Sequence, residues 1–195
     1  MGKINLLDVT VANLIAAGEV VERPASAIKE LIENSFDAGA KNITVEIKHG
    51  GISFFRVTDD GSGIAPEDVP LAIKRHATSK ISKADDLSAI MTLGFRGEAL
   101  AAIAAVSNMR IITKTRDNLS AVILSSEYGQ NIEISETGAP LGTTVIVEEL
   151  FSNTPARLKF LKKDCLAKLP NQLDGVTIVM FPLFSASEKI RFFFR

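Results

Sequence analysis

The sequence contains few of the residues that build disulfide and metal sites. It has one cysteine, two histidines and no tryptophan among its 195 residues. A single cysteine excludes an internal disulfide framework and a cysteine-rich zinc site. The two histidines, His49 and His76, are too few and too far apart in the chain for a histidine metal site. These absences are typical of a protein from a reducing compartment.

Long apolar segments are also missing. Runs such as Ala99–Val106 are far shorter than the roughly 20 residues of a membrane span. No charged stretch followed by an apolar one opens the chain, so no signal peptide is visible. We therefore expect a soluble protein that makes no membrane contact.

The charge balance and motif content exclude further classes. The net charge is −1, which gives no support to a dominant nucleic-acid-binding surface, although a local basic patch is compatible with it. Walker-type Gly-Lys-Ser/Thr, the Gly-x-Ser-x-Gly elbow and His-Glu-x-x-His are all absent. What is present is 46% apolar residues, which is enough to bury a core in a chain of this length.

The order of the predicted elements favours an α+β fold. Pro24 begins a helix with apolar positions at helical spacing, and Gly39 ends it. A strand hairpin follows over 43–58, and two helices are predicted over Pro66–Ile73 and Gly97–Val106. This order predicts one mixed or antiparallel sheet with helices on one face. The later strand-like segments are Met109–Thr115, Ala121–Ser126, Ile132–Glu136 and Thr143–Glu149.

The last thirty residues differ from the rest. Pro170 ends a helix that begins after Thr154, and Val176–Phe184 is almost entirely apolar. Such a strand near a chain end is expected to need a pairing partner. We expect the chain to stop inside a longer architecture.

Two polar residues of the first predicted helix are one turn apart. Glu30 and Asn34 have the i, i+4 spacing that places side chains on one helix face. A carboxamide oxygen can ligate Mg²⁺, and a carboxylate can orient or deprotonate a water molecule. The same spacing also fits an ordinary solvated helix face.

Three glycine-containing segments add candidate ligand contacts. Asp59 is followed by Gly61 and Gly63, so a ligand could approach the backbone closely beside a buried hydrogen-bond acceptor. The stretch 94–97 precedes a helix, an arrangement that suits a phosphate. Gly142-Thr143 opens a predicted strand. Taken singly, each also fits a plain turn, a helix junction or a threonine in a strand.

Taken in this order, the four segments resemble the ATP-binding motifs of the GHKL ATPases, which include gyrase B, heat-shock chaperones and histidine kinases. The resemblance narrows to the MutL family of DNA mismatch repair proteins. It extends over about residues 5–163 and is poor over 166–195, within one ATP-binding domain spanning 1–195. The segments that narrow it are Ile15–Ser26, Arg75–Lys80, Gly94–Leu100 and Asn153–Arg157.

The resemblance implies a Bergerat-type fold, a two-layer α/β sandwich with a mixed, mostly antiparallel sheet of about eight strands. It implies that Glu30 is the general base for the attacking water and that Asn34 coordinates Mg²⁺. Asp59 would accept a hydrogen bond from the adenine amino group. Gly63 would let the base lie against the loop, and Thr143 would support the adenine through water.

The resemblance also implies residues around the phosphates and above the nucleotide. His76 would be a structural residue of a lid rather than a catalyst. The further implied residues are Thr78, Ser79 and Lys80 in the lid, and Gly94, Phe95, Arg96, Gly97, Glu98, Ala99 and Leu100, whose backbone would bind the phosphates at a helix N-terminus.

The implied function is a Mg²⁺-dependent ATPase that acts as a switch in mismatch repair. The implied partners are a MutS-type mismatch recognition protein, a downstream nuclease or helicase, DNA in a weak and sequence-independent way, and a second copy through ATP-dependent pairing. The implied location is the cytoplasm, near a bacterial nucleoid, or the nucleus of a eukaryote.

Two departures from the family pattern qualify this expectation. Asp60 stands where asparagine is common, and we expect little effect because Asp59 is intact. MutL proteins continue with a second domain whose lysine reaches the γ-phosphate, and with a C-terminal dimerisation domain. We therefore expect weak hydrolysis and no endonuclease activity from these 195 residues. The alternatives are a nucleotide-binding fragment with little or no hydrolysis, and another branch of the superfamily such as a topoisomerase or a chaperone.

Overall fold

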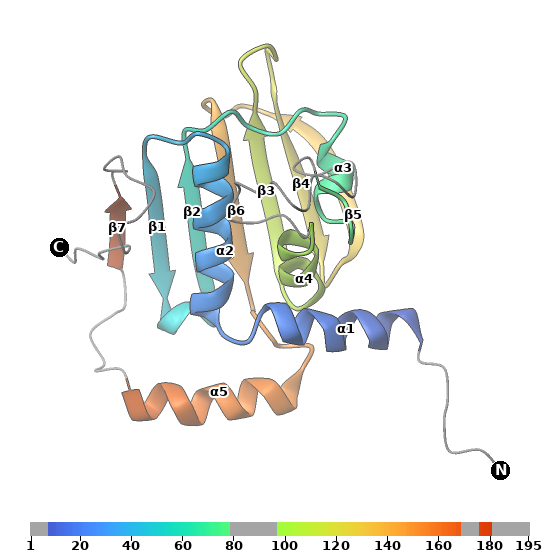
Figure 1. Cartoon of the computed structure of the whole chain (residues 1–195), viewed down its shortest axis with the longest axis vertical. Coiled ribbons are helices and arrows are strands. Elements are labelled where there is room, and N and C mark those ends of the chain that lie inside the picture. Colours follow the sequence, from blue (N-terminus) through green and yellow to red (C-terminus); the bar gives the residue numbers. More distant parts are fainter. Residues whose placement is uncertain (1–7, 79–96, 169–175, 181–195) are drawn as a thin grey trace, which may run out of the picture.

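The computed structural model describes residues 8–78, 97–168 and 176–180. They contain one seven-stranded sheet with the strand order β5-β4-β3-β6-β2-β1-β7 (Figure 1). All six pairings between these strands are antiparallel, so the described sheet is not mixed. The bounds are β1 Ile43–Lys48, β2 Phe54–Asp59, β3 Asn108–Lys114, β4 Ala121–Glu127, β5 Gln130–Thr137, β6 Gly142–Glu148 and β7 Val176–Met180.

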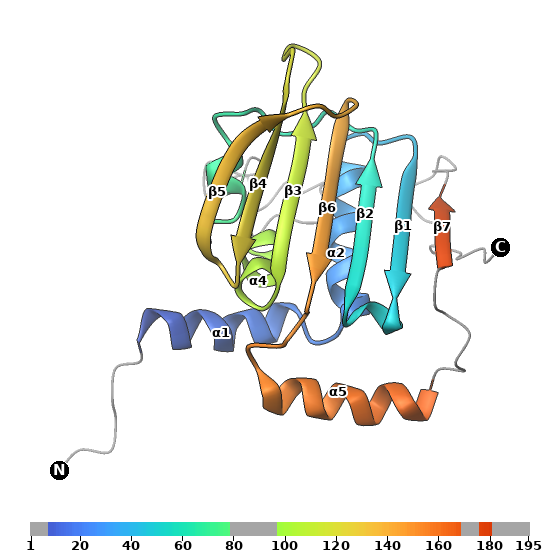
Figure 2. The ribbon, with the colours of Figure 1, turned by 180° about the vertical axis from the view of Figure 1, so that it is seen from behind.

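The helices form a second layer and a lower border. Figure 1 shows α2 and α4 over one face of the sheet. Figure 2 gives the opposite view, in which the strands lie in front of these two helices. The predicted α+β, two-layer architecture is confirmed. In the described ranges no helix has both the length and the hydrophobicity to cross a membrane. The bounds are α1 Val9–Val20, α2 Pro24–Asp37, η1 His49–Gly51, α3 Val69–Ala72, α4 Ala99–Ala105 and α5 Pro155–Lys168.

The core lies between the helix layer and the inner face of the sheet. Alternate residues of each central strand point inward, as the two-residue period of a strand requires. On α2 the buried positions recur every three or four residues, which matches the predicted apolar face. The largest fully buried side chains include Ile32 of α2, Ile43 of β1, Phe55 of β2, Ile103 of α4, and Met109 and Ile111 of β3.

Helix α2 begins and ends where the sequence predicts. Pro24 occupies the first turn, where its missing N–H costs no hydrogen bond. At the other end Gly39 has a φ of 72°, and its N–H donates to the carbonyl of Phe36 over 2.9 Å. The left-handed residue closes the helix and directs the chain into β1.

Helix α5 is joined to α1 by one arginine. The Arg157 Nη2 donates to the carbonyl of Gly18 over 2.6 Å, and its guanidinium lies 5.2 Å from the centre of the Phe151 ring. A Cβ at Gly18 would stand 2.5 Å from Arg157 Nη1, so the glycine makes room for this contact. Arg157 therefore bonds two helices far apart in sequence.

Three elements differ from the predictions or extend them. Helix α1 was not predicted as an element. Helix α3 begins at Val69 rather than at Pro66, because the carbonyl of Ala65 first closes a turn by accepting the N–H groups of Asp68 and Val69. The predicted strand 176–184 is described over Val176–Met180, where β7 pairs with β1 and so has its expected partner.

Candidate functional site

A cavity of about 80 Å³ lies between α2 and the inner face of β2 and β6. Five residues predicted for the site line it: Asn34, Asp59, Gly63, Leu100 and Thr143. A larger hollow of about 530 Å³ is lined by residues of β3 to β6 and contains none of the predicted residues. The other residues lining the smaller cavity are Leu31, Ser35, Ala38, Val57, Ile64 and Val145.

The carboxylate of Asp59, at the end of β2, is held by three donors. Its Oδ1 accepts the backbone N–H of Gly61 over 2.9 Å and that of Thr143 over 3.2 Å. Its Oδ2 accepts the hydroxyl of Ser35 over 2.8 Å, and Ser35 is buried. A carboxylate offers about four acceptor positions, so Oδ2 keeps one for a ligand. Asp59 is thus an oriented acceptor in the cavity wall.

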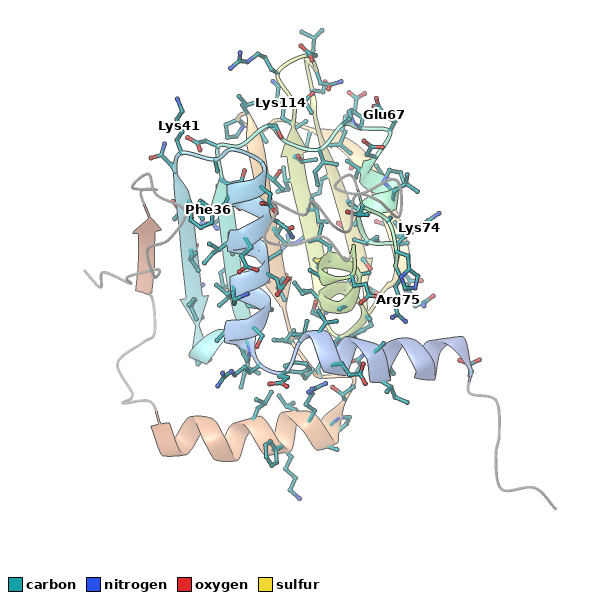
Figure 3. The ribbon with its side chains drawn as sticks, viewed as in Figure 1. Phe36, Lys41, Glu67, Lys74, Arg75 and Lys114 are labelled. Carbon is teal, nitrogen blue, oxygen red and sulfur yellow. The ribbon has the colours of Figure 1, made fainter. Side chains whose placement is uncertain are left out.

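Two glycines allow backbone to pack directly on backbone around Asp59. Gly63 has a φ of 75°, and a Cβ there would overlap the carbonyl of Lys114. Gly142 has a φ of 114°, and a Cβ there would overlap the carbonyl of Asp59. Figure 3 shows Lys114 at the upper end of the sheet, where β2 also ends. Glycine is required at both positions by the protein's own backbone as well as by any ligand.

Glu30 and Asn34 lie on successive turns of α2, as predicted. Asn34 lines the cavity, whereas Glu30 does not, and its side chain is 30% exposed. The Lys29 ammonium is 2.7 Å from a carboxylate oxygen of Glu33 and 3.8 Å from one of Glu30. The hydrogen bond that Lys29 donates to Glu33, together with the nearby negative charges of Glu33 and Glu30, raises the pKa of Lys29. The helix therefore places the Asn34 carboxamide at the cavity and the Glu30 carboxylate one turn away, outside the residues that line it.

The predicted lid and phosphate segments meet where the structure describes them. Gly97 has a φ of 61°, and a Cβ there would stand 2.5 Å from the carbonyl oxygen of Ala77. The Glu98 carboxylate is 3.5 Å from the Arg75 guanidinium and 3.3 Å from His76 Nδ1. Thr78 also lies beside Gly97, and Ala99 and Leu100 begin α4. Ser79, Lys80, Gly94, Phe95 and Arg96 lie outside the described residues.

Sequence reasoning missed two polar residues of this region. Ser35 lies among the buried residues of α2, and its hydroxyl donates to Asp59 Oδ2. Thr113 of β3 accepts the backbone N–H of Ile64 over 2.8 Å and lies 3.1 Å from the hydroxyl of Thr143. The sequence does contain one signal for both residues: each places a hydroxyl at an inward-facing position of a helix or strand whose other inward-facing residues are mostly apolar.

Comparison with known proteins identifies the relatives of this chain. A family model described as "Histidine kinase-, DNA gyrase B-, and HSP90-like ATPase" matches residues 22–146. The chain is 51% identical over 195 residues to the DNA mismatch repair protein MutL of Symbiobacterium thermophilum, covering 100% of this chain and 30% of that protein. It is 57% identical over 163 residues to MutL of Caldanaerobacter subterraneus subsp. tengcongensis, covering 84% of this chain and 28% of that protein. The chain thus spans about three tenths of the length of these curated relatives.

Solved structures agree with this relationship. The "N terminal domain of a DNA repair protein" superimposes with a TM-score of 0.68 at 34% identity, covering 84% of this chain and 47% of that one. The "Aquifex aeolicus MutL ATPase domain complexed with ADP" superimposes with a TM-score of 0.58 at 32% identity, covering 76% of this chain and 53% of that one.

Proposed function

The chain belongs to the family of histidine kinase-, DNA gyrase B- and HSP90-like ATPases, and from that membership we propose that the cavity beside α2 binds ATP for hydrolysis in DNA mismatch repair. The observation that carries the proposal is the carboxylate of Asp59, held by three donors with an acceptor position left at the cavity. The similarity to MutL proteins, one of them solved with ADP, supports it.

The chemistry of Asp59 selects adenine among the purines. Adenine presents an exocyclic amine, which donates to a carboxylate oxygen. Guanine and hypoxanthine present a carbonyl at the same position, which places two acceptors face to face. A site built to accept a hydrogen bond discriminates strongly against a ligand that cannot donate one, because the remaining acceptor position then faces a second acceptor and has no donor.

The test is Asp59→Asn, a variant that the surroundings of Asp59 accommodate. The amide oxygen can replace Oδ1 as acceptor for Gly61 and Thr143. The Ser35 hydroxyl can turn to the carbonyl of Leu31, 3.1 Å away, and accept from the new amide N–H. The variant should fold normally, lose ATP-analogue binding by roughly a hundredfold, and bind an ITP analogue relatively better. Unchanged selectivity in calorimetric titrations would sink the assignment of Asp59.

For hydrolysis, we propose that Glu30 orients and deprotonates the attacking water. The Asn34 carboxamide oxygen is a hard, neutral donor on the cavity wall, which fits Mg²⁺; phosphate oxygens and waters would complete its shell. Bound Mg²⁺ supplies charge neutralisation at the phosphates, and the chain supplies positioning. We also propose a lid over the nucleotide that contains Thr78, Ser79 and Lys80. The phosphates would be bound by the backbone of residues 94–100.

The wider role follows from the relatives and extends beyond these residues. We propose an ATP-driven switch that couples a MutS-type recognition protein to a downstream nuclease or helicase, with weak DNA contact and pairing of two copies. This role would place the protein in the bacterial cytoplasm or in a eukaryotic nucleus. We expect no endonuclease activity from the chain itself.

A second candidate function is nucleotide binding with little or no hydrolysis. It is favoured by the position of Glu30, which is not among the residues that line the cavity. Single-turnover hydrolysis with excess protein and radiolabelled ATP separates the two functions. Phosphate release that depends on Glu30 supports the ATPase, whereas tight binding without release supports the binding module.

A further inference from the structure

We propose that Thr113 is a positioning residue of the nucleotide site, because its hydroxyl joins the glycine loop after β2 to Thr143 and sets which groups face the base. This inference rests on the proposed function. It concerns a residue that the sequence motifs do not include, and that acts through Thr143 and Ile64 rather than by touching nucleotide.

The register of the sheet places Thr113 in the same row as the cavity acid. Thr113 of β3 is opposite Thr143 of β6, and Thr143 is opposite Asp59 of β2. Directly opposed residues in an antiparallel sheet point to the same face. Thr113 is 1% exposed, so its hydroxyl needs partners within the protein.

The hydroxyl of Thr113 finds three such partners. It accepts the backbone N–H of Ile64 over 2.8 Å, donates to the carbonyl of Gly142 over 3.2 Å, and lies 3.1 Å from the hydroxyl oxygen of Thr143. A hydroxyl has one donor and two acceptor positions. When the Thr113 hydroxyl donates its proton to the Gly142 carbonyl, the Thr113 oxygen can only accept a hydrogen bond from the Thr143 hydroxyl.

If the Thr113 proton stays on the Gly142 carbonyl, Thr143 is the donor of the hydrogen bond that the two hydroxyls share. The remaining lone pairs of Thr143 are then available to the cavity that it lines. Thr143 then offers an acceptor on the same side as Asp59. Two neighbouring acceptors suit the two N–H groups of an adenine amine in direct contact, and do not suit a carbonyl in the same place.

Thr113 also fixes the cavity wall. Ile64 lines the cavity, and the preceding Gly63 lies against the carbonyl of Lys114 with no side chain between them. The bond from Ile64 N–H to Thr113 sets how far the loop stands from β3. Removing the hydroxyl leaves that N–H without its acceptor and lets the Thr143 hydroxyl rotate.

The experiment compares Thr113→Val with Thr113→Ser in the full chain, using calorimetric titration with a non-hydrolysable ATP analogue and the matching ITP analogue. Thr113→Val should bind the ATP analogue roughly tenfold more weakly and the ITP analogue within about twofold of the unmodified chain. Thr113→Ser keeps the hydroxyl and should restore both affinities. The ratio of the two affinities is the readout that a merely structural role would not move.

Thr144→Val is the matched control. The Thr144 hydroxyl bonds the hydroxyl of Thr58 over 3.2 Å, and alternation places both on the other face of the sheet. The same chemical change one residue from Thr143 should leave both affinities unchanged. If Thr113→Val fails to fold by circular dichroism, Thr113→Cys gives the comparison, because a thiol is a weak donor and acceptor.

The outcomes separate this inference from the proposed function. If the unmodified chain binds neither analogue, both fail. If it binds the ATP analogue and Thr113→Val keeps the same ATP-to-ITP ratio, whether through unchanged affinities or an equal loss of both, the positioning role is overturned and the proposed function stands.

Discussion

Asp60, beside the cavity acid, ties the loop before β1 to the end of β2. Its carboxylate accepts the backbone N–H groups of Lys41 over 2.7 Å and of Asn42 over 2.8 Å, and the Asn42 side-chain amide over 2.7 Å. These hydrogen bonds, those from Asn42 first, hold the pKa of Asp60 below its ordinary value. Asp60, which stands where asparagine is common in the family, thus has three N–H donors that stabilise its negative charge.

The lowered pKa predicts an acid dependence of stability. A carboxyl whose folded-state pKa is depressed stabilises the fold above the unfolded-state value of about 4, and this contribution is lost as the pH falls through the folded pKa. Asp60→Asn should therefore flatten the decline of the unfolding free energy below about pH 4. Urea unfolding at a series of acid pH values checks this. Parallel curves for both proteins would contradict it.

Glu30 carries the prediction about chemistry. Glu30→Gln should lower the single-turnover hydrolysis rate by roughly 10²- to 10⁴-fold, the usual contribution of a general base. Affinity for the ATP analogue should stay within about threefold, since Glu30 is not in the cavity wall. Glu46→Gln, which breaks the ion pair with Arg56 on β2, is the control. Loss of analogue binding in Glu30→Gln would reassign Glu30 to structure.

At the scale of elements, the joint between α1 and α5 predicts a local stability effect. Arg157→Met removes the hydrogen bond to Gly18 and the contact with the Phe151 ring, and should lower the unfolding free energy by about 1–2 kcal/mol. Lys159→Met changes an exposed residue of the same helix and should have little effect. Equal melting temperatures for the two variants would show that the Arg157 contacts contribute nothing.

The elements that the sequence predicted well are those with one apolar face. The helix from Pro24 and the strand at Ile43–Lys48 bury alternate or helically spaced positions, and their patterns are visible in the sequence. Helix α1 escaped prediction because the run from Leu14 to Ala17 is apolar on all sides, which removes the periodic signal. Helix α3 was placed too early because Pro66 suits a turn as well as a helix start.

The candidate site was predictable where motifs exist and not where partners are distant. Asp59, Gly63 and Thr143 belong to short glycine-containing strings that the resemblance could match. Ser35 and Thr113 act through hydrogen bonds across 24 and 30 residues of sequence, to Asp59 and Thr143. The first bond depends on how α2 packs on the sheet, and the second on the pairing of β3 with β6, so each joins segments that no local stretch of sequence contains.

For the whole molecule, ligand binding predicts a change in stability. A ligand at a hundred times its dissociation constant stabilises the folded state by about 2.7 kcal/mol through mass action. For a chain of this size that corresponds to a rise in melting temperature of roughly 5–10 °C. The non-hydrolysable ATP analogue with Mg²⁺ should produce this rise, and Asp59→Asn should abolish it. An unmoved melting curve in the unmodified chain would count against nucleotide binding.

Strand β6 joins two parts of the sheet that are formed from separate stretches of the chain. The β1–β2 hairpin and the three strands β3–β4–β5 each pair neighbours in sequence, and among the strands that the structure describes only β6 joins the two groups, pairing with β2 on one side and β3 on the other. The bond from Thr143 to Asp59 spans 84 residues of chain. On the ribosome, the two half-sheets must wait until Gly142–Glu148 has emerged from the exit tunnel. Capture of nucleotide by a nascent chain would therefore report that this last central strand has been inserted.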